Sequence, residues 1–220
     1  LLSLLLVLVM ILTACSDGET QAPQTPETPE TPGSAEEQPE GTDGGKYAEE
    51  QVYKYTYAEE ITTLNYLINT TWVDMSVAAN LIDALAQYDK YGILQPALAE
   101  SWKVSEDGLE WTFNLRKGVM WVDYEGNEIA ETTAHDFVSS AKYILTKANE
   151  SESANLVYSV IKNAEEYFNE EITDFSQVGV RAEDDYTLVY TLKKPVPYFE
   201  SMLTYVSFFP VYGPFLEEMG

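Results

Sequence analysis

The sequence predicts a fold of the α/β class, with strands and helices mixed in the α+β manner, for the residues that follow position 50. Residues 109–115 alternate between apolar and polar side chains, as a half-buried strand does. Apolar residues after position 133 recur at helical spacing behind a capping box. Strand and helix patterns do not alternate regularly along the chain, which favours α+β over repeated βαβ units.

The first two elements follow from two different periods. Residues 52–57 place three tyrosines on one face, which predicts a strand. Apolar residues then recur every three or four positions from Met75 to Leu85 and predict a helix, with Asp74 as its N-cap.

Two hairpins and two more helices are expected after that helix. The first hairpin joins a strand that ends at Val104 to the strand 109–115 through a Ser-Glu-Asp-Gly turn at 105–108. The second joins residues 178–182 to residues 187–192.

The expected helices are marked at their starts or by their spacing. Thr133 and Asp136 form the capping box of a helix that continues to Ala148. The apolar residues from Leu156 to Phe168 predict another helix.

The N-terminal residues are typical of an export signal. Residues 1–12 are apolar apart from Ser3, a run too short for the roughly 20 residues of a membrane-spanning helix. They end in Leu-Thr-Ala-Cys, which resembles the lipobox of bacterial lipoproteins. That resemblance implies a signal peptide at 1–14 and a diacylglycerol group on Cys15; the alternative is a buried cysteine at the end of an N-terminal membrane helix.

A linker is expected at 15–46. From position 16 to 45 the chain contains no aromatic residue and no Leu, Ile, Val or Met, and it is rich in Pro, Glu, Thr and Gly. Such a segment cannot bury enough apolar surface to offset its chain entropy, so we expect it to be disordered and extended.

The charge of the chain excludes one class of partner. It carries 12 Lys+Arg against 37 Asp+Glu, a formal net charge of −25, which would repel a phosphate backbone. Nucleic acid is therefore not an expected partner. With one cysteine, the chain can form no internal disulfide.

Signals for catalysis or metal binding are weak. The single histidine, His135, gives a zinc site too few expected ligands, and we interpret it as a surface or packing residue. No Gly-x-Ser-x-Gly elbow and no glycine-rich phosphate loop is present. We therefore expect no catalytic residue, no metal and no cofactor. Trp72 stands apart, because it lies in a polar loop where an amphipathic ring could face a ligand.

Several motifs in a fixed order resemble one family. They are Pro-Ala-Leu-Ala-Glu-Ser-Trp at 96–102, Trp-Thr-Phe-Asn-Leu-Arg at 111–116, Gly118, Trp121, Thr-Ala-His-Asp-Phe-Val at 133–138, Asp-Tyr-Thr-Leu at 185–188 and Pro-Val-Pro-Tyr-Phe at 195–199. Together they resemble the extracellular solute-binding proteins of oligopeptide and dipeptide ABC importers, over about residues 52–215. One departure is a longer segment at 122–132, which we interpret as a surface hairpin.

The resemblance implies a bilobed fold of the periplasmic-binding-protein type. Residues 47–220 would be its N-terminal portion. Within them, 52–81 would begin the first lobe, 82–209 would form an extra subdomain, and 210–220 would return to the first lobe. The second lobe would lie beyond this sequence.

The function implied by the resemblance is capture of oligopeptides outside the cell and delivery to an ABC permease, without catalysis. A monomer held at the outer face of the membrane by Cys15 is expected, and the long linker favours a Gram-positive surface. The family's ligand loop maps to Thr70, Thr71 and Trp72, and a second approach to the ligand maps to Ser153 and Asn155.

Other functions stay open at this point. The same fold could bind a nickel chelate, an opine or an oligosaccharide. A surface lipoprotein hydrolase and an adhesion or interaction module are further alternatives.

Overall fold

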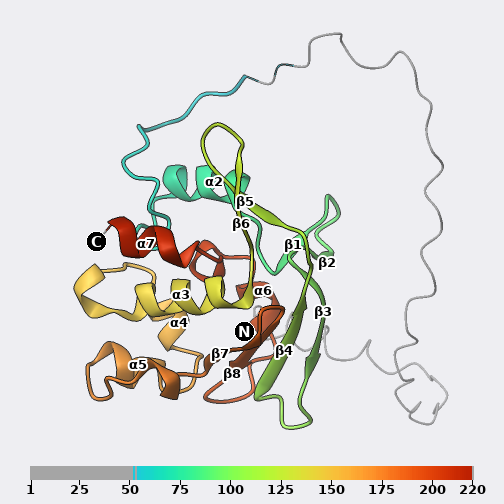
Figure 1. Cartoon of the computed structure of the whole chain (residues 1–220), viewed down its shortest axis with the longest axis vertical. Coiled ribbons are helices and arrows are strands. Elements are labelled where there is room, and N and C mark those ends of the chain that lie inside the picture. The colour runs from blue at the N-terminus through green and yellow to red at the C-terminus, as the bar shows by residue number, and fades with distance from the viewer. Residues whose placement is uncertain (1–51, 53, 220) are drawn as a thin grey trace, which may run out of the picture. The chain divides into compact units, whose positions relative to one another are not determined.

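The computed structural model describes residue 52 and residues 54–219, whose arrangement is drawn in Figure 1. The predictions for the signal peptide (1–14), for Cys15 and for the linker (15–46) lie outside the described residues. The strands are β1 (Ala86–Tyr88), β2 (Leu94–Pro96), β3 (Ala99–Val104), β4 (Glu110–Leu115), β5 (Met120–Val122), β6 (Glu128–Glu131), β7 (Val180–Asp184) and β8 (Thr187–Thr191). The helices are α2 (Trp72–Leu81), α3 (Ala134–Leu145), α4 (Ala154–Tyr158), α5 (Ala164–Phe168), α6 (Phe199–Met202) and α7 (Gly213–Met219). Short 3-10 turns are η1 (Lys147–Asn149), η2 (Phe175–Gln177) and η3 (Val206–Phe208). The predicted mixture of strands and helices is confirmed.

The main sheet of the described residues is antiparallel, in the order β3-β4-β8-β7. It is built from the two hairpins predicted from the sequence, which meet along β4 and β8 (Figure 1). In the first hairpin, the Ser105 hydroxyl donates to Asp107 at 2.5 Å and accepts from the Glu110 amide at 2.8 Å. Gly108 closes the turn at a φ of +70°, a conformation that glycine adopts without a steric cost.

The core lies where the sheet meets α3 and the segment around α6. Phe113 of β4 and Tyr190 of β8 face it, with ring centroids 6.0 Å apart. Phe199 at the start of α6 and Ile144 of α3 are both 0% exposed. Burial also raises the pKa of the Tyr190 hydroxyl far above its ordinary value, so this phenol stays neutral in the folded protein. The alternating apolar residues predicted for 109–115 thus form the sheet's inner face.

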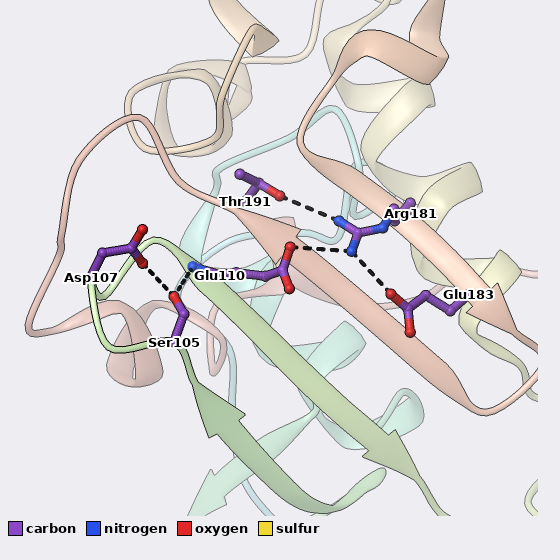
Figure 2. Close-up of polar contacts among 6 residues, drawn as sticks. All are labelled: Ser105, Asp107, Glu110, Arg181, Glu183 and Thr191. Carbon is purple, nitrogen blue, oxygen red and sulfur yellow. Dashed lines mark hydrogen bonds and ion pairs between the residues drawn. The ribbon is translucent and has the colours of Figure 1, made fainter.

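The Arg181 side chain connects three strands on the exposed face of the sheet. From β7, its guanidinium donates to the Thr191 hydroxyl on β8 at 3.4 Å and to the Glu110 carboxylate on β4 at 3.2 Å (Figure 2). It also donates to Glu183 on its own strand at 3.0 Å. Because these side chains are largely exposed, each ion pair contributes about 1 kcal/mol or less. The cluster is therefore a modest cross-strand support.

Two predicted elements at the start of the described chain need correction. Residue 52 and residues 54–57 lie in irregular structure, so the strand prediction is wrong for them. A strand needs a hydrogen-bonded neighbour, and no described strand pairs with this segment. The predicted helix is present as α2, but it begins at Trp72 and ends at Leu81, because Thr71 and Ile82 have extended backbones. Asp74 therefore lies in the first turn, and the N-cap assignment is wrong.

The predicted helices at 133–148 and 156–168 had different outcomes. The capping box of Thr133 and Asp136 is confirmed, but α3 ends at Leu145 and Ala148 lies in η1. The segment 156–168 is two short helices, α4 and α5, so the prediction of one helix is wrong. Between them Asn163 has a φ of +57°, and its neighbour Lys162 bonds the backbone of Thr191. Pairing with the end of β8 thus replaces the middle of the expected helix.

The segment 122–132 forms the predicted surface hairpin, made by β5 and β6. Its turn is organised by Asp123, whose carboxylate accepts from the Glu125 amide and from the Asn127 amide and side chain. Tyr124 at the tip is 96% exposed. The hairpin thus extends a pair of strands into solvent and leaves the main sheet unchanged.

Candidate functional site

Asp74 organises the loop that precedes α2. Its carboxylate, 4% exposed as a residue, accepts from the Thr62 amide at 2.9 Å and the Thr62 hydroxyl at 2.6 Å. It also accepts from the side-chain amide of Asn69 at 2.8 Å. The Asn69 carbonyl in turn accepts from the Thr71 amide at 2.5 Å. Both ends of the loop at 62–71 are therefore fixed to one buried carboxylate.

Acidification is expected to weaken the fold through Asp74. The hydrogen bond from the Thr62 side chain is the main cause that lowers the Asp74 pKa below its ordinary value of 3.8. Because the folded pKa lies below the unfolded one, the unfolded chain binds more protons in this range. The stabilisation is therefore complete above the unfolded pKa and is lost as the pH falls through the folded pKa.

The measurement is the melting temperature of the wild type and of Asp74→Asn as a function of pH. We expect the substitution to lower the melting temperature at neutral pH and the difference to shrink below the ordinary pKa of 3.8. Asp83→Asn, at an exposed carboxylate that follows α2, serves as the control and should change little at either pH. A difference between wild type and Asp74→Asn that did not depend on pH would contradict the role of the ionised carboxylate.

The loop before α2 is joined to a second segment far away in the sequence. The Ser151 hydroxyl donates to the Leu67 carbonyl at 2.5 Å, and the Glu152 amide donates to the Ile68 carbonyl at 3.0 Å. The Thr70 hydroxyl and amide both donate to Oε2 of Glu152, at 2.8 and 3.3 Å. The loop before α2 is thus held against the residues that precede α4 through contacts of Leu67, Ile68 and Thr70 with Ser151 and Glu152.

The segments that carry the two groups of site residues predicted from the family resemblance are in contact, and Thr70 is the predicted residue that bonds across, to Glu152. Thr70 and Asn155 are exposed, Thr71 is half-buried, and Trp72 is 76% exposed at the first position of α2. Ser153 differs from the others, because it is 1% exposed and its hydroxyl lies 3.3 Å from that of Ser151. The prediction that these residues bind a ligand is not tested by their positions, and it stays a prediction.

Glu152 and Asn69 were not predicted, although they fix the geometry of this loop. Asn69 could have been noticed as an Asx turn residue two positions before Thr71. The role of Glu152 could not be recognised from its neighbours in the sequence, because its partner Thr70 is 82 positions away. In so acidic a chain, a single glutamate also does not stand out.

A hollow of ≈ 670 Å³ lies elsewhere on the described residues. Its aromatic lining includes Tyr66, Trp121, Tyr124, Tyr212 and Phe215. None of the predicted site residues lines it, and its lining comes largely from α7 and the β5–β6 hairpin.

His135 is a surface residue, as expected. Its Nε2 lies 3.5 Å from a carboxylate oxygen of Asp185, and its side chain is 62% exposed. Within residues 54–219, no three His, Cys, Asp or Glu side chains are grouped so that they could hold a metal ion. The helices of this described region include none with the length and apolar character needed to cross a membrane.

Known proteins are similar to this chain in sequence and fold over part of their length. Residues 94–218 match the family model of bacterial extracellular solute-binding proteins, family 5 middle. The chain is 44% identical to the oligopeptide-binding protein AmiA of Streptococcus pneumoniae, over 77% of this chain and 26% of that protein. A substrate-binding domain of an oligopeptide ABC transporter from Bacillus anthracis has a similar structure, with a TM-score of 0.72 and 34% identity over 79% of this chain and 32% of that one. Peptide-bound OppA of Listeria monocytogenes gives a TM-score of 0.67 at 28% identity, over 73% of this chain and 30% of that one. The chain therefore spans only 26–32% of the length of these proteins.

Proposed function

The chain belongs to the family 5 bacterial extracellular solute-binding proteins, and from that premise we propose that the protein captures oligopeptides outside the cell and delivers them to an ABC import permease. The names of the relatives support peptides as the solute. AmiA is named an oligopeptide-binding protein, and the Bacillus anthracis protein is named the substrate-binding domain of an oligopeptide ABC transporter. No chemical step on the peptide is part of this function.

One observation on this chain carries the proposal. The loop 67–72, which holds three of the expected ligand residues, is fixed by Asp74 from one side and by the segment 151–152 from the other. A rigid loop loses little conformational entropy when a ligand binds. The Trp72 side chain, at the end of this loop, is 76% exposed. Such a large amphipathic ring can pack on many kinds of peptide side chain, so it does not require one peptide sequence.

We propose the lobe assignment expected from the family. Residues 52–81 begin the first lobe, 82–209 form the extra subdomain and 210–220 return to the first lobe. The two lobes close over the peptide by a hinge motion. The peptide drives this closure only because it binds the closed form more tightly than the open form. Hydrogen bonds to the main chain of an extended peptide fix the orientation of the peptide. Its side chains enter pockets that also hold water molecules.

The function is tested by native mass spectrometry of the whole mature protein after incubation with a mixed peptide pool. Retained masses that match short peptides support the proposal. An unliganded mass, together with an unchanged melting temperature in the pool, would contradict it and direct the search to sugars, opines and metal chelates.

We propose that the protein is held at the outer face of the cell membrane by a diacylglycerol group on Cys15, and that the linker 15–46 carries the binding domain away from the lipid. Cys15→Ser is expected to move the protein from the membrane fraction to the soluble fraction, because the thiol is the only site for the lipid in that motif. Thr13→Ser leaves the thiol in place and should remain membrane-bound. The measurement is fractionation of whole cells followed by immunoblotting. A Cys15→Ser protein that stayed in the membrane fraction would contradict the anchor.

A further inference from the structure

The Glu152 carboxylate is held beside the loop that carries three of the expected ligand residues. Both hydrogen bonds that it accepts from Thr70 go to one oxygen, Oε2, at 2.8 and 3.3 Å. No described residue donates to the other oxygen, Oε1. The residue as a whole is exposed, at the contact between Thr70 and the residues that precede α4.

No cation of the protein neutralises this carboxylate within the described residues. The ion pairs found there are those of Arg181 with Glu110 and Glu183, of Lys193 with Glu165 and of His135 with Asp185, and none includes Glu152. Thr70 supplies only neutral donors, which fix the position of the carboxylate but leave its charge in place. A positioned, unpaired carboxylate attracts a cationic group and can accept a short charge-assisted hydrogen bond from it.

We propose that Glu152 is a specificity-determining residue that favours peptides presenting a cationic nitrogen to this loop. The inference rests on the proposed function and deepens it, because it names a class of peptide. The cationic group is the ammonium or guanidinium of a basic side chain, since both offer charged N–H donors. Trp72 lies two positions from Thr70, so the loop also offers an exposed ring for the apolar stem of such a residue.

A purely structural role for Glu152 is the competing explanation, and glutamine separates the two. Glu152→Gln keeps an oxygen that accepts from Thr70, so the link between the segments 67–72 and 151–155 is retained. The negative charge is lost, and the amide group that replaces Oε1 is a donor that repels a cation. The overall field of an acidic protein also attracts cations. Glu106→Gln, at an exposed glutamate in the β3–β4 turn, changes the net charge equally and controls for that field.

The experiment measures the dissociation constants of the whole mature protein for a set of alanine hexapeptides. One position at a time carries lysine or its neutral counterpart norleucine, and each peptide has a free or an acetylated amino terminus. We expect the wild type to prefer the cationic peptide by about fivefold at one position, the upper range for an ion pair that solvent still reaches. Glu152→Gln should abolish this preference and Glu106→Gln should retain it, with melting temperatures like that of the wild type.

The outcomes separate the inference from the function on which it rests. A preference that follows lysine supports the inference, and one that follows only the free amino terminus overturns it. A preference that survives in Glu152→Gln, or a wild type that binds lysine and norleucine peptides equally, overturns the inference while peptide binding stands. If the wild type binds neither these hexapeptides nor any member of the mixed pool, the proposed function itself fails.

Discussion

Replacing Phe199 by alanine is expected to lower the free energy of unfolding by about 3–5 kcal/mol, the usual range for a buried phenylalanine. The ring is 0% exposed, and its centroid lies 5.3 Å from that of Trp111, 5.6 Å from Tyr190 and 6.0 Å from Phe208. These partners come from β4, β8 and η3. Truncation removes the ring and leaves a cavity that three separate elements would have to move to fill.

Urea denaturation at neutral pH, followed by tryptophan fluorescence, measures this loss. Tyr198→Ala is the matched control, because the neighbouring aromatic side chain is 62% exposed. Its effect should stay within about 0.5 kcal/mol, as is usual for surface substitutions. If the two variants lost equal stability, Phe199 could not be the centre of the core.

Trp72→Ala is expected to weaken peptide binding about 30-fold, which corresponds to the roughly 2 kcal/mol of an aromatic hot spot. The indole is 76% exposed, so it contributes little to folding and its surface is available to a ligand. Closing a second lobe over the ring would remove that surface from water. We therefore expect the melting temperature without peptide to stay near that of the wild type.

Calorimetric titration of the whole mature protein with a peptide retained from the pool gives the affinity. Tyr124→Ala removes an aromatic ring that is even more exposed, 96%, at the tip of the β5–β6 hairpin. That variant should bind like the wild type, because the hairpin holds none of the expected ligand residues. An unchanged dissociation constant for Trp72→Ala would remove this residue from the site.

Local patterns predicted the elements whose partners are close in the sequence. The hairpin of β3 and β4 follows from alternation and turn residues, and the start of α3 follows from Thr133 and Asp136. The segment 156–168 was predicted less well, because its apolar spacing also fits two short helices. What divides it is the pairing of Ile161 with Leu192, a contact between distant residues that spacing does not contain.

The candidate site was predicted in part for the same reason. Family resemblance indicated Thr70, Trp72 and Asn155. The polar residues before Trp72 were visible in the sequence itself, but the placement of Trp72 in that loop was wrong, because Trp72 is the first residue of α2. The role of Asp74 was mistaken, because a carboxylate near a helix start is typical of a cap whether or not a loop folds around it. Glu152 could not be found at all without the contact that brings it to Thr70.

The pairing of β4 with β8 has a consequence for how the chain reaches its native state. Each hairpin closes through a short turn and can form within microseconds, whereas β4 and β8 meet only when the long segment between them closes into a loop, at a larger entropic cost. Until then both strands present an unpaired edge lined with apolar side chains. While that loop is open, these two edges are the places where one chain can pair with another and begin to aggregate.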